Sequence, residues 1–195
     1  MEDSKYVIEL SKLIKEEKFM REIVLFIAAS LDGYIADTSG KVDWLEGQEE
    51  QTEMPDVYGE FIKDVDTVIM GWNTYHQIVT ELSPDKWVYK GLTSYVITHR
   101  TVCSTEKIRF TDENPRELVR RLQKENGKSI WICGGANLIG QLIQENLIDR
   151  YYITVIPILL GRGIRLFPSG KQEIKLRLES VQNYNGITDL VYCRR

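Results

Sequence analysis

The sequence is poor in cysteine, histidine and proline, and it has no excess of positive charge. Its 195 residues include 3 cysteines, 2 histidines and 5 prolines, and 29 acidic against 25 basic residues give a formal net charge of −4. The widely spaced Cys103, Cys133 and Cys193 favour a reducing cytoplasmic location over a disulfide framework. His76 and His99 lie far from them in the sequence, so no metal site is expected. The negative balance argues against a general affinity for nucleic acid.

Long apolar segments are also absent. The longest, from Tyr151 to Leu160, is interrupted by Thr154 and Pro157 and is far shorter than the ~20 residues that cross a membrane. The N-terminal Met1-Glu2-Asp3 does not resemble a secretory signal. With 43% hydrophobic and 28% charged residues, the chain is too apolar to be disordered and is expected to form one domain with one core.

Apolar runs and helical spacings alternate from Ile23 onward. We expect strands at 23–28, 67–70, 94–98, 130–133 and 151–156, and helices at 56–63, 73–80, 114–127 and 137–145. Strands at 176–181 and 187–192 should form a closing hairpin around Asn185-Gly186. The pattern predicts an α/β domain over residues 21–195, with a mostly parallel sheet, helices on both faces and an antiparallel hairpin at one edge.

Two segments are set apart from this alternation. Residues 37–55 are polar and are expected to form an irregular loop. Residues 6–19 have apolar side chains at helical spacing, so we interpret 1–20 as an N-terminal helical extension. It is either an accessory piece packed on the domain or an upstream segment that carries no chemistry.

Three predicted strand ends carry groups that suit a phosphate. The segments 71–74 and 134–138 each join a strand to a helix start, where free backbone N–H groups attract anions. Thr98, His99 and Arg100 end a third strand with a hydroxyl, an imidazole and a guanidinium. Ordinary capping, a plain glycine turn and a solvated strand end are the alternative interpretations. Because parallel strands end at one edge, the three together predict a dinucleotide site that prefers NADPH to NADH.

These segments resemble dihydrofolate reductase-like proteins, particularly the reductase domain of the bifunctional riboflavin-biosynthesis deaminase-reductase and its stand-alone bacterial relatives. The resemblance rests on ASLDGYIA at 29–36, VIMGWNT at 68–74, ICGGA at 132–136 and LID followed by PILLGRG within 147–167. It covers residues 21–194 and implies a three-layer α/β sandwich.

The same resemblance implies a set of cofactor-binding residues. They are Ala29, Ile35, Gly71, Trp72, Asn73, Thr74, Thr98, His99, Arg100, Cys133, Gly134, Gly135, Ala136, Asn137 and Leu138. In the family the double-glycine peptide is cis, so we expect a cis bond between Gly134 and Gly135. Trp72 stands where dihydrofolate reductases usually carry arginine, and Arg100 is expected to compensate for that missing charge.

The resemblance also implies groups on the substrate side. The expected catalytic residues are Asp32, Asp56, Glu60 and Thr154, and the expected ring-pocket residues are Trp44, Tyr58 and Phe61. Asp56 matches the carboxylate that aids protonation, Thr154 matches its threonine partner, and Asp32 begins a loop over the site. Carboxylates on a short helix are more often simply solvated. Phe26 and Cys133 stand where riboflavin reductases usually carry lysine and glutamate.

The leading hypothesis is therefore an NADPH-dependent reductase that transfers hydride to a heteroaromatic, pteridine- or pyrimidine-like small molecule. The reaction would resemble that of 5-amino-6-(5-phosphoribosylamino)uracil reductase in riboflavin biosynthesis. The alternatives are a nucleotide-binding module without turnover and a dihydrofolate reductase. By the same resemblance, we expect a homodimer that pairs through its late strands and the segment Pro157–Gly163. The cysteine usage, charge and hydropathy described above predict a cytoplasmic protein with no nucleic-acid or membrane partner.

Overall fold

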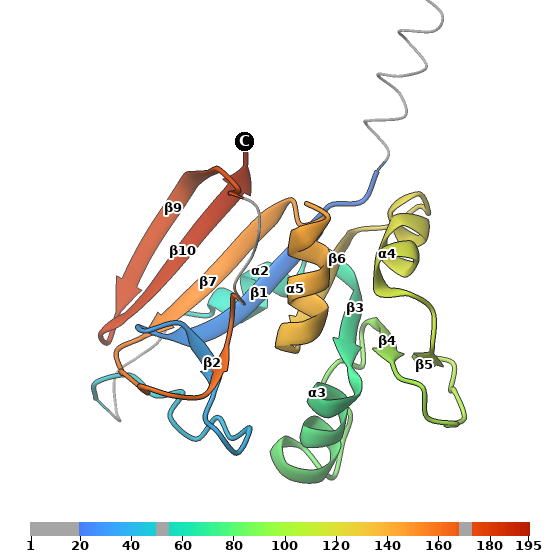
Figure 1. The fold of residues 1–195 in the computed structure, drawn as a ribbon, viewed down its shortest axis with the longest axis horizontal. Helices are drawn as coiled ribbons and strands as arrows, with labels where there is room; N and C mark the ends of the chain where they lie inside the picture. Colours follow the sequence, from blue (N-terminus) through green and yellow to red (C-terminus); the bar gives the residue numbers. More distant parts are fainter. Residues whose placement is uncertain (1–19, 50–54, 168–172) are drawn as a thin grey trace, which may run out of the picture.

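The computed structural model describes residues 20–49, 55–167 and 173–195, and its centre is an eight-stranded sheet (Figure 1). Its strands are β1 (Ile23–Ser30), β3 (Val65–Gly71), β4 (Thr93–Ile97), β5 (Ile108–Thr111), β6 (Ser129–Gly134), β7 (Arg150–Ile156), β9 (Leu176–Tyr184) and β10 (Ile187–Arg194). They lie in the order β5-β4-β3-β6-β1-β7-β10-β9. The first six are mutually parallel, whereas β10 runs antiparallel to β7 and β9. The predicted sheet and its antiparallel edge are confirmed.

The helices lie where they were predicted, although the helix predicted at 114–127 ends at Gln123, four residues before Gly127. They are α2 (Val57–Ile62), α3 (Trp72–Gln77), the π-helical turn η1 (Ile78–Leu82), α4 (Pro115–Gln123) and α5 (Ala136–Gln144). Asn114 caps α4 as predicted, because its side chain accepts the Arg116 N–H at 3.0 Å. No helix in the described ranges is long and apolar enough to span a membrane. The extension predicted at 1–20 falls almost wholly outside these ranges, so it stays a prediction.

The helices form a layer on each face of the sheet. In Figure 1, α5 lies in front of the sheet and α2 behind it. Leu118 of α4 and Leu142 of α5 pack with Ile23, whereas Phe61 of α2 packs with Val24 on the opposite face. Ile23 and Val24 belong to different cores because successive side chains of a strand point to opposite faces. The predicted three-layer sandwich is confirmed.

The sequence patterns missed the shortest strands. β2 (Tyr34–Ala36) and β8 (Ile164–Arg165) form a separate two-stranded sheet, and β5 pairs with β4 at the edge of the main sheet. Two to four residues are too few to show a period, so only the tertiary pairing defines these strands. The hairpin turn is as predicted, because Asn185 and Gly186 have φ of 47° and 75°.

Candidate functional site

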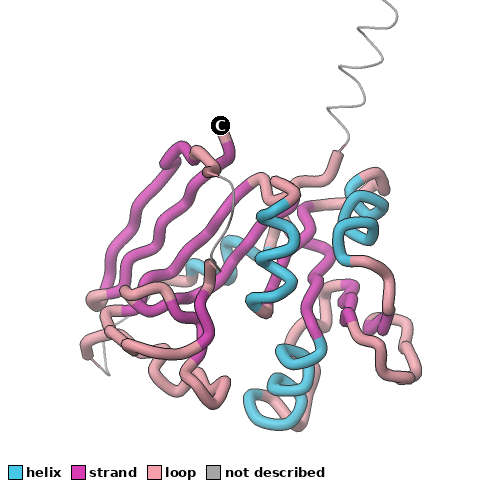
Figure 2. Tube along the Cα trace, in the orientation of Figure 1, coloured by secondary structure: helices cyan, strands magenta, loops and turns pink. Residues whose placement is uncertain are grey.

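The two predicted glycine turns meet at the carboxyl edge of the parallel strands, where connecting loops gather (Figure 2). Gly71 ends β3 and Gly134 ends β6, and these strands are neighbours in the sheet. A Cβ atom on Gly134 or Gly135 would lie 3.5 Å from the Thr74 hydroxyl oxygen, and one on Gly71 would lie 4.0 Å from the Gly135 nitrogen. Glycine therefore leaves the space between the two turns open. The peptide between Gly134 and Gly135 is cis, as predicted.

The start of α5 offers unpaired backbone donors at this edge. Its N-cap is Gly135, and no side chain caps it. The first N–H groups of a helix have no acceptor within the helix, and they lie at the positive end of its dipole. The start of α5 is therefore a place where an anion can accept several backbone hydrogen bonds.

A cleft of about 1380 Å³ runs along this edge and contains most of the predicted cofactor residues. Those that line it are Ile35, Gly71, Trp72, Asn73, Thr74, Arg100, Cys133, Gly134, Gly135, Ala136, Asn137 and Leu138. Ala29 instead packs in the core beneath α5, because alternation along β1 places Ala28 on the cleft wall. Thr98 and His99 are not among the lining residues.

One end of the cleft carries a guanidinium stacked on an indole. The Arg100 guanidinium carbon lies 4.9 Å from the centroid of the Trp72 ring, close enough for a cation–π contact. Thr98 is buried, and its hydroxyl accepts the Arg100 N–H at 3.1 Å, which shapes the strand end. His99 is exposed. Trp72 thus holds the Arg100 guanidinium at this end of the cleft, and the compensating role of Arg100 stays a prediction.

The other end of the cleft, here called the aromatic end, consists of Phe26, Tyr58, Tyr89, Trp131 and Cys133. The Tyr58 ring lies 6.1 Å from Phe26 and 6.0 Å from Trp131, and the Tyr89 ring lies 5.0 Å from Trp131. The Trp131 indole N–H donates to the Phe26 carbonyl at 3.0 Å. Tyr89 belongs to a loop without a motif, and Trp131 has the pattern of an ordinary core residue, so sequence reasoning missed both.

Partial burial makes the polar groups of the aromatic end harder to ionise. Desolvation raises the pKa of the Cys133 thiol to about 11, although a 3.5 Å contact with the Tyr89 hydroxyl opposes the shift. Desolvation also raises the pKa of Tyr58 and of Tyr89 above the usual phenol value. At neutral pH this end therefore presents two phenol hydroxyls and a thiol, all protonated.

Two predicted ring-pocket residues lie away from the cleft wall. Phe61 stacks on Phe26 with ring centroids 4.4 Å apart and belongs to the core under α2. The Trp44 indole N–H donates to the Lys41 carbonyl at 3.3 Å, within its own loop. Only Tyr58 of the three predicted pocket residues lines the cleft.

Asp32 connects two loops beside the site. Its carboxylate accepts hydrogen bonds from the Ser30 hydroxyl at 2.6 Å, the Leu160 N–H at 3.1 Å and the Gly161 N–H at 2.7 Å. The Ser30 contact is the main reason that the pKa of Asp32 lies below its ordinary value. These bonds join the segment after β1 to the segment after β7, so the geometry gives Asp32 a positioning role.

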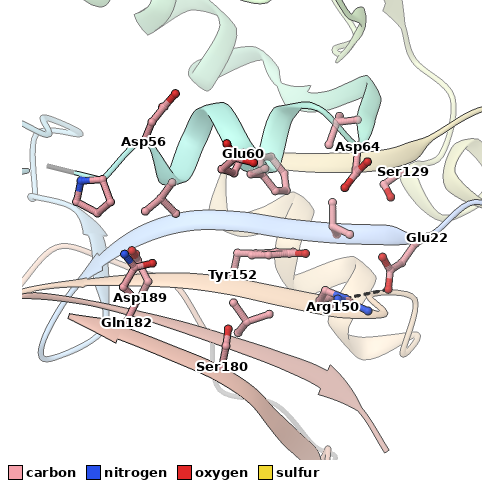
Figure 3. A pocket seen from close by; sticks show the side chains of 16 residues that line it. Glu22, Asp56, Glu60, Asp64, Ser129, Arg150, Tyr152, Ser180, Gln182 and Asp189 are labelled. Atoms are coloured by element: carbon pink, nitrogen blue, oxygen red, sulfur yellow. Dashed lines mark hydrogen bonds and ion pairs between the residues drawn. The ribbon is translucent and has the colours of Figure 1, made fainter. Parts of the chain in front are cut away.

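A second cavity of about 590 Å³ lies between α2 and the strands β1, β7, β9 and β10 (Figure 3). Asp56 and Glu60 line this cavity; Asp56 accepts the Gly59 N–H at 2.8 Å to cap α2. The Thr154 hydroxyl donates to buried Asp189 at 2.5 Å, rather than to Asp56. The structure therefore does not bring Asp56, Glu60 or Thr154 to the cleft wall, and their catalytic roles stay predictions.

Comparison with known proteins shows the family to which this chain belongs. The family model of the RibD C-terminal domain matches residues 21–190. The chain belongs to the RibD C-terminal domain family. A curated relative, the uncharacterized protein YwjB of Bacillus subtilis, is 40% identical over 89% of this chain and 98% of its own length. The riboflavin biosynthesis protein RibD of Haemophilus influenzae is 24% identical over 73% of this chain and 49% of its own length.

Solved structures confirm the fold of this RibD C-terminal domain. A putative riboflavin biosynthesis protein from Shewanella has a TM-score of 0.77 and 28% identity over 89% of this chain and 99% of its own. The deaminase/5-amino-6-(5-phosphoribosylamino)uracil reductase of Thermotoga maritima has a TM-score of 0.67 and 14% identity over 90% of this chain and 57% of its own. Dihydrofolate reductase of Enterococcus faecalis, solved with NADP(H), has a TM-score of 0.60 and 18% identity over 90% of this chain and 98% of its own. The fold is dihydrofolate reductase-like, and the family is one of reductases.

Proposed function

We propose that this protein is an NADPH-dependent reductase of a flat, pteridine- or pyrimidine-like heterocycle, related in reaction to 5-amino-6-(5-phosphoribosylamino)uracil reductase. One observation carries the proposal: a single cleft joins the uncapped start of α5, the paired glycine turns, the Arg100–Trp72 contact and the aromatic end. Each part alone has an ordinary structural explanation. Their convergence suits a dinucleotide that lies beside a planar second ligand.

The residues of the cleft fit the coenzyme. Its volume of about 1380 Å³ exceeds the ~300–1,000 Å³ of most small-molecule sites, so it can hold a dinucleotide and a small ring together. The amides at the start of α5 would bind the diphosphate, and Arg100 would bind the 2′-phosphate. Ala28 and Ile35 would line the nicotinamide site. When bound, NADPH supplies the hydride.

The chain's own contribution is then to orient the ring. Phe26, Tyr58 and Trp131 offer apolar ring surfaces against which a flat heterocycle can stack. Among the described residues, no carboxylate belongs to the aromatic end, and the protonated phenols there are weak acids. We therefore assign the proton that accompanies the hydride to solvent water that enters through the open cleft.

The missing carboxylate also favours a second candidate. A nucleotide-binding module that keeps the coenzyme site without turnover would need no proton donor at the aromatic end. A dihydrofolate reductase, the third alternative, receives less support because Asp56 lies on the second cavity.

Calorimetry and a turnover assay test these candidates together. NADPH and NADH are titrated separately into the protein, and NADPH consumption is then followed with 7,8-dihydropterins and with 5-amino-6-(5-phosphoribosylamino)uracil. We expect NADPH to bind more tightly than NADH and to be consumed with at least one ring compound. Binding without consumption selects the binding module, and absence of NADPH binding refutes the coenzyme site.

We also propose the homodimer that the family resemblance implies and the cytoplasmic location that the cysteine usage predicts. β9 is an edge strand of the sheet, and its Leu178 and Val181 side chains are 50% and 53% exposed. Exposed apolar residues on an edge strand suit pairing with a second copy. Light scattering after gel filtration gives the oligomeric mass; a monomer at all concentrations would contradict the dimer.

A further inference from the structure

The two ends of the cleft differ in charge. Among the described lining residues, the ionisable groups other than Cys133 and the tyrosines are His76, Glu81 and Arg100. His76 and Arg100 both lie against the Trp72 ring, at 5.9 Å and 4.9 Å from its centroid. The aromatic end has no charged side chain among these residues, whereas the Arg100 guanidinium lies at the opposite end of the cleft.

The sheet order sets how far apart these ends lie. Arg100 follows β4, whereas Phe26 lies on β1, and β4 and β1 are three positions apart in the sheet. Neighbouring strands are separated by ~4.8 Å, so the two ends lie roughly 14 Å apart across the sheet. A cation that binds the 2′-phosphate of a coenzyme cannot also neutralise a phosphate at the aromatic end.

We infer that the second ligand of this cleft is an uncharged planar heterocycle that carries no phosphate, and that the Tyr58 hydroxyl donates a hydrogen bond to it. The inference rests on the proposed function, because it names the substrate class of the same reductase site. It separates this chain from an enzyme that requires a phosphoribosyl group on its pyrimidine ring.

Tyr58 is the side chain best placed to act on such a ligand. It is 41% exposed, comes from α2 and lines the cleft. Its hydroxyl has no hydrogen-bond partner among the described residues, whereas the Tyr89 hydroxyl contacts the Cys133 sulfur and the Trp131 indole N–H is already used. A ring carbonyl or ring nitrogen would supply the missing acceptor.

A phosphate at the aromatic end would be unfavourable for a simple reason. A phosphate monoester carries nearly two negative charges at neutral pH, and an ion that leaves water without a cationic partner loses its solvation without compensation. A neutral ring loses far less, and it gains the aromatic surfaces of Phe26, Tyr58 and Trp131. The aromatic end therefore selects its ligand by charge as well as by shape.

A matched pair of ligands tests the inference. Calorimetric affinities are measured for 5-amino-6-ribosylaminouracil and its 5′-phosphate, each with and without saturating NADPH; 6-methyl-7,8-dihydropterin serves as a second uncharged ring. We expect the unphosphorylated uracil to bind at least about tenfold more tightly than its phosphate. If the dihydropterin is reduced, its C=N carbon takes the hydride and its nitrogen takes one proton from water, while NADPH becomes NADP⁺.

Substitutions at the exposed Tyr58 sharpen the test without disturbing the core. Tyr58→Phe keeps the ring and should weaken the unphosphorylated ligand about threefold to tenfold, because one hydrogen bond is lost. Tyr58→Lys supplies a cation and should reverse the preference toward the phosphate. Tyr192→Phe on β10, which lies outside the cleft lining, is the matched control and should change neither affinity.

The outcomes separate the two proposals. Equal or tighter binding of the phosphate by the unmodified protein overturns the inference, as does failure of every uncharged ring to bind. Failure of NADPH itself to bind refutes the proposed function instead. The ring comparison made without coenzyme still decides the inference in that case.

Discussion

Removal of the Arg100 guanidinium should abolish the preference of the protein for NADPH over NADH. Arg100 is exposed, and Trp72 holds it at the end of the cleft. A hydrogen bond to a charged group is worth ~1.5–3 kcal/mol, and solvent screening favours the lower value here. A loss of about 1.4 kcal/mol weakens binding about tenfold. We therefore expect Arg100→Ala to raise the Kd for NADPH about tenfold and to leave the Kd for NADH within about twofold.

Calorimetric titration of both coenzymes measures this difference directly. Arg177→Ala is the matched control, because Arg177 is an exposed arginine on β9, at the opposite edge of the sheet from β4. Arg100→Lys should give an intermediate value, since lysine keeps the charge but loses the planar fork that stacks on Trp72. Equal weakening of NADPH and NADH by Arg100→Ala would refute the assignment of the 2′-phosphate to this end of the cleft.

Three further predictions concern loop anchoring, thiol reactivity and the core. Asp32→Asn should speed hydrogen exchange of the Leu160 and Gly161 amides, and unchanged exchange in the variant would disprove the anchor. Because the pKa of Asp32 is lowered in the folded protein, the stabilisation by this anchor is fully present above pH 3.8 and is lost as the pH falls through the lowered pKa. At neutral pH, iodoacetamide should label exposed Cys103, whereas peptide mass mapping should find Cys133 unmodified, because the pKa of its thiol is raised to about 11; prompt labelling of Cys133 would contradict that raised pKa. Leu118→Ala, in a fully buried position, should lower the free energy of unfolding in urea by about 3 kcal/mol, whereas Val88→Ala at an exposed position should leave it nearly unchanged.

The cofactor half of the candidate site was predictable because it is made of backbone. Gly71 and Gly134-Gly135 follow buried strands, and a glycine between a strand and a helix is visible in the sequence itself. Parallel strands then bring such turns to one edge, as the structure confirms. Arg100 was found by its position after a strand, although its contact with Trp72 depends on two chain segments that only the fold brings together.

The substrate half was harder to predict, because side chains from separate elements compose it. Tyr89 and Trp131 reach the cleft from a loop and from β6, and neither belongs to a motif. Thr154 matched a family threonine, but its hydroxyl partner is Asp189 because β7 and β10 are paired in that register. Cross-strand partners of this kind depend on strand order, which local patterns do not specify.

The sequence by itself determined the alternation of strands and helices, the capped start of α4, the hairpin turn at Asn185-Gly186 and the glycine turns, because each depends on residues within a few positions of one another. Only the tertiary structure decided which face of the sheet each side chain covers at the aromatic end, and that Asp56 and Glu60 line a different cavity from the coenzyme candidates. The physical reason is distance along the chain: local hydrogen bonding and backbone conformation are set by neighbours, whereas a wall made of Phe26, Tyr58 and Trp131 exists only after the sheet has packed against α2.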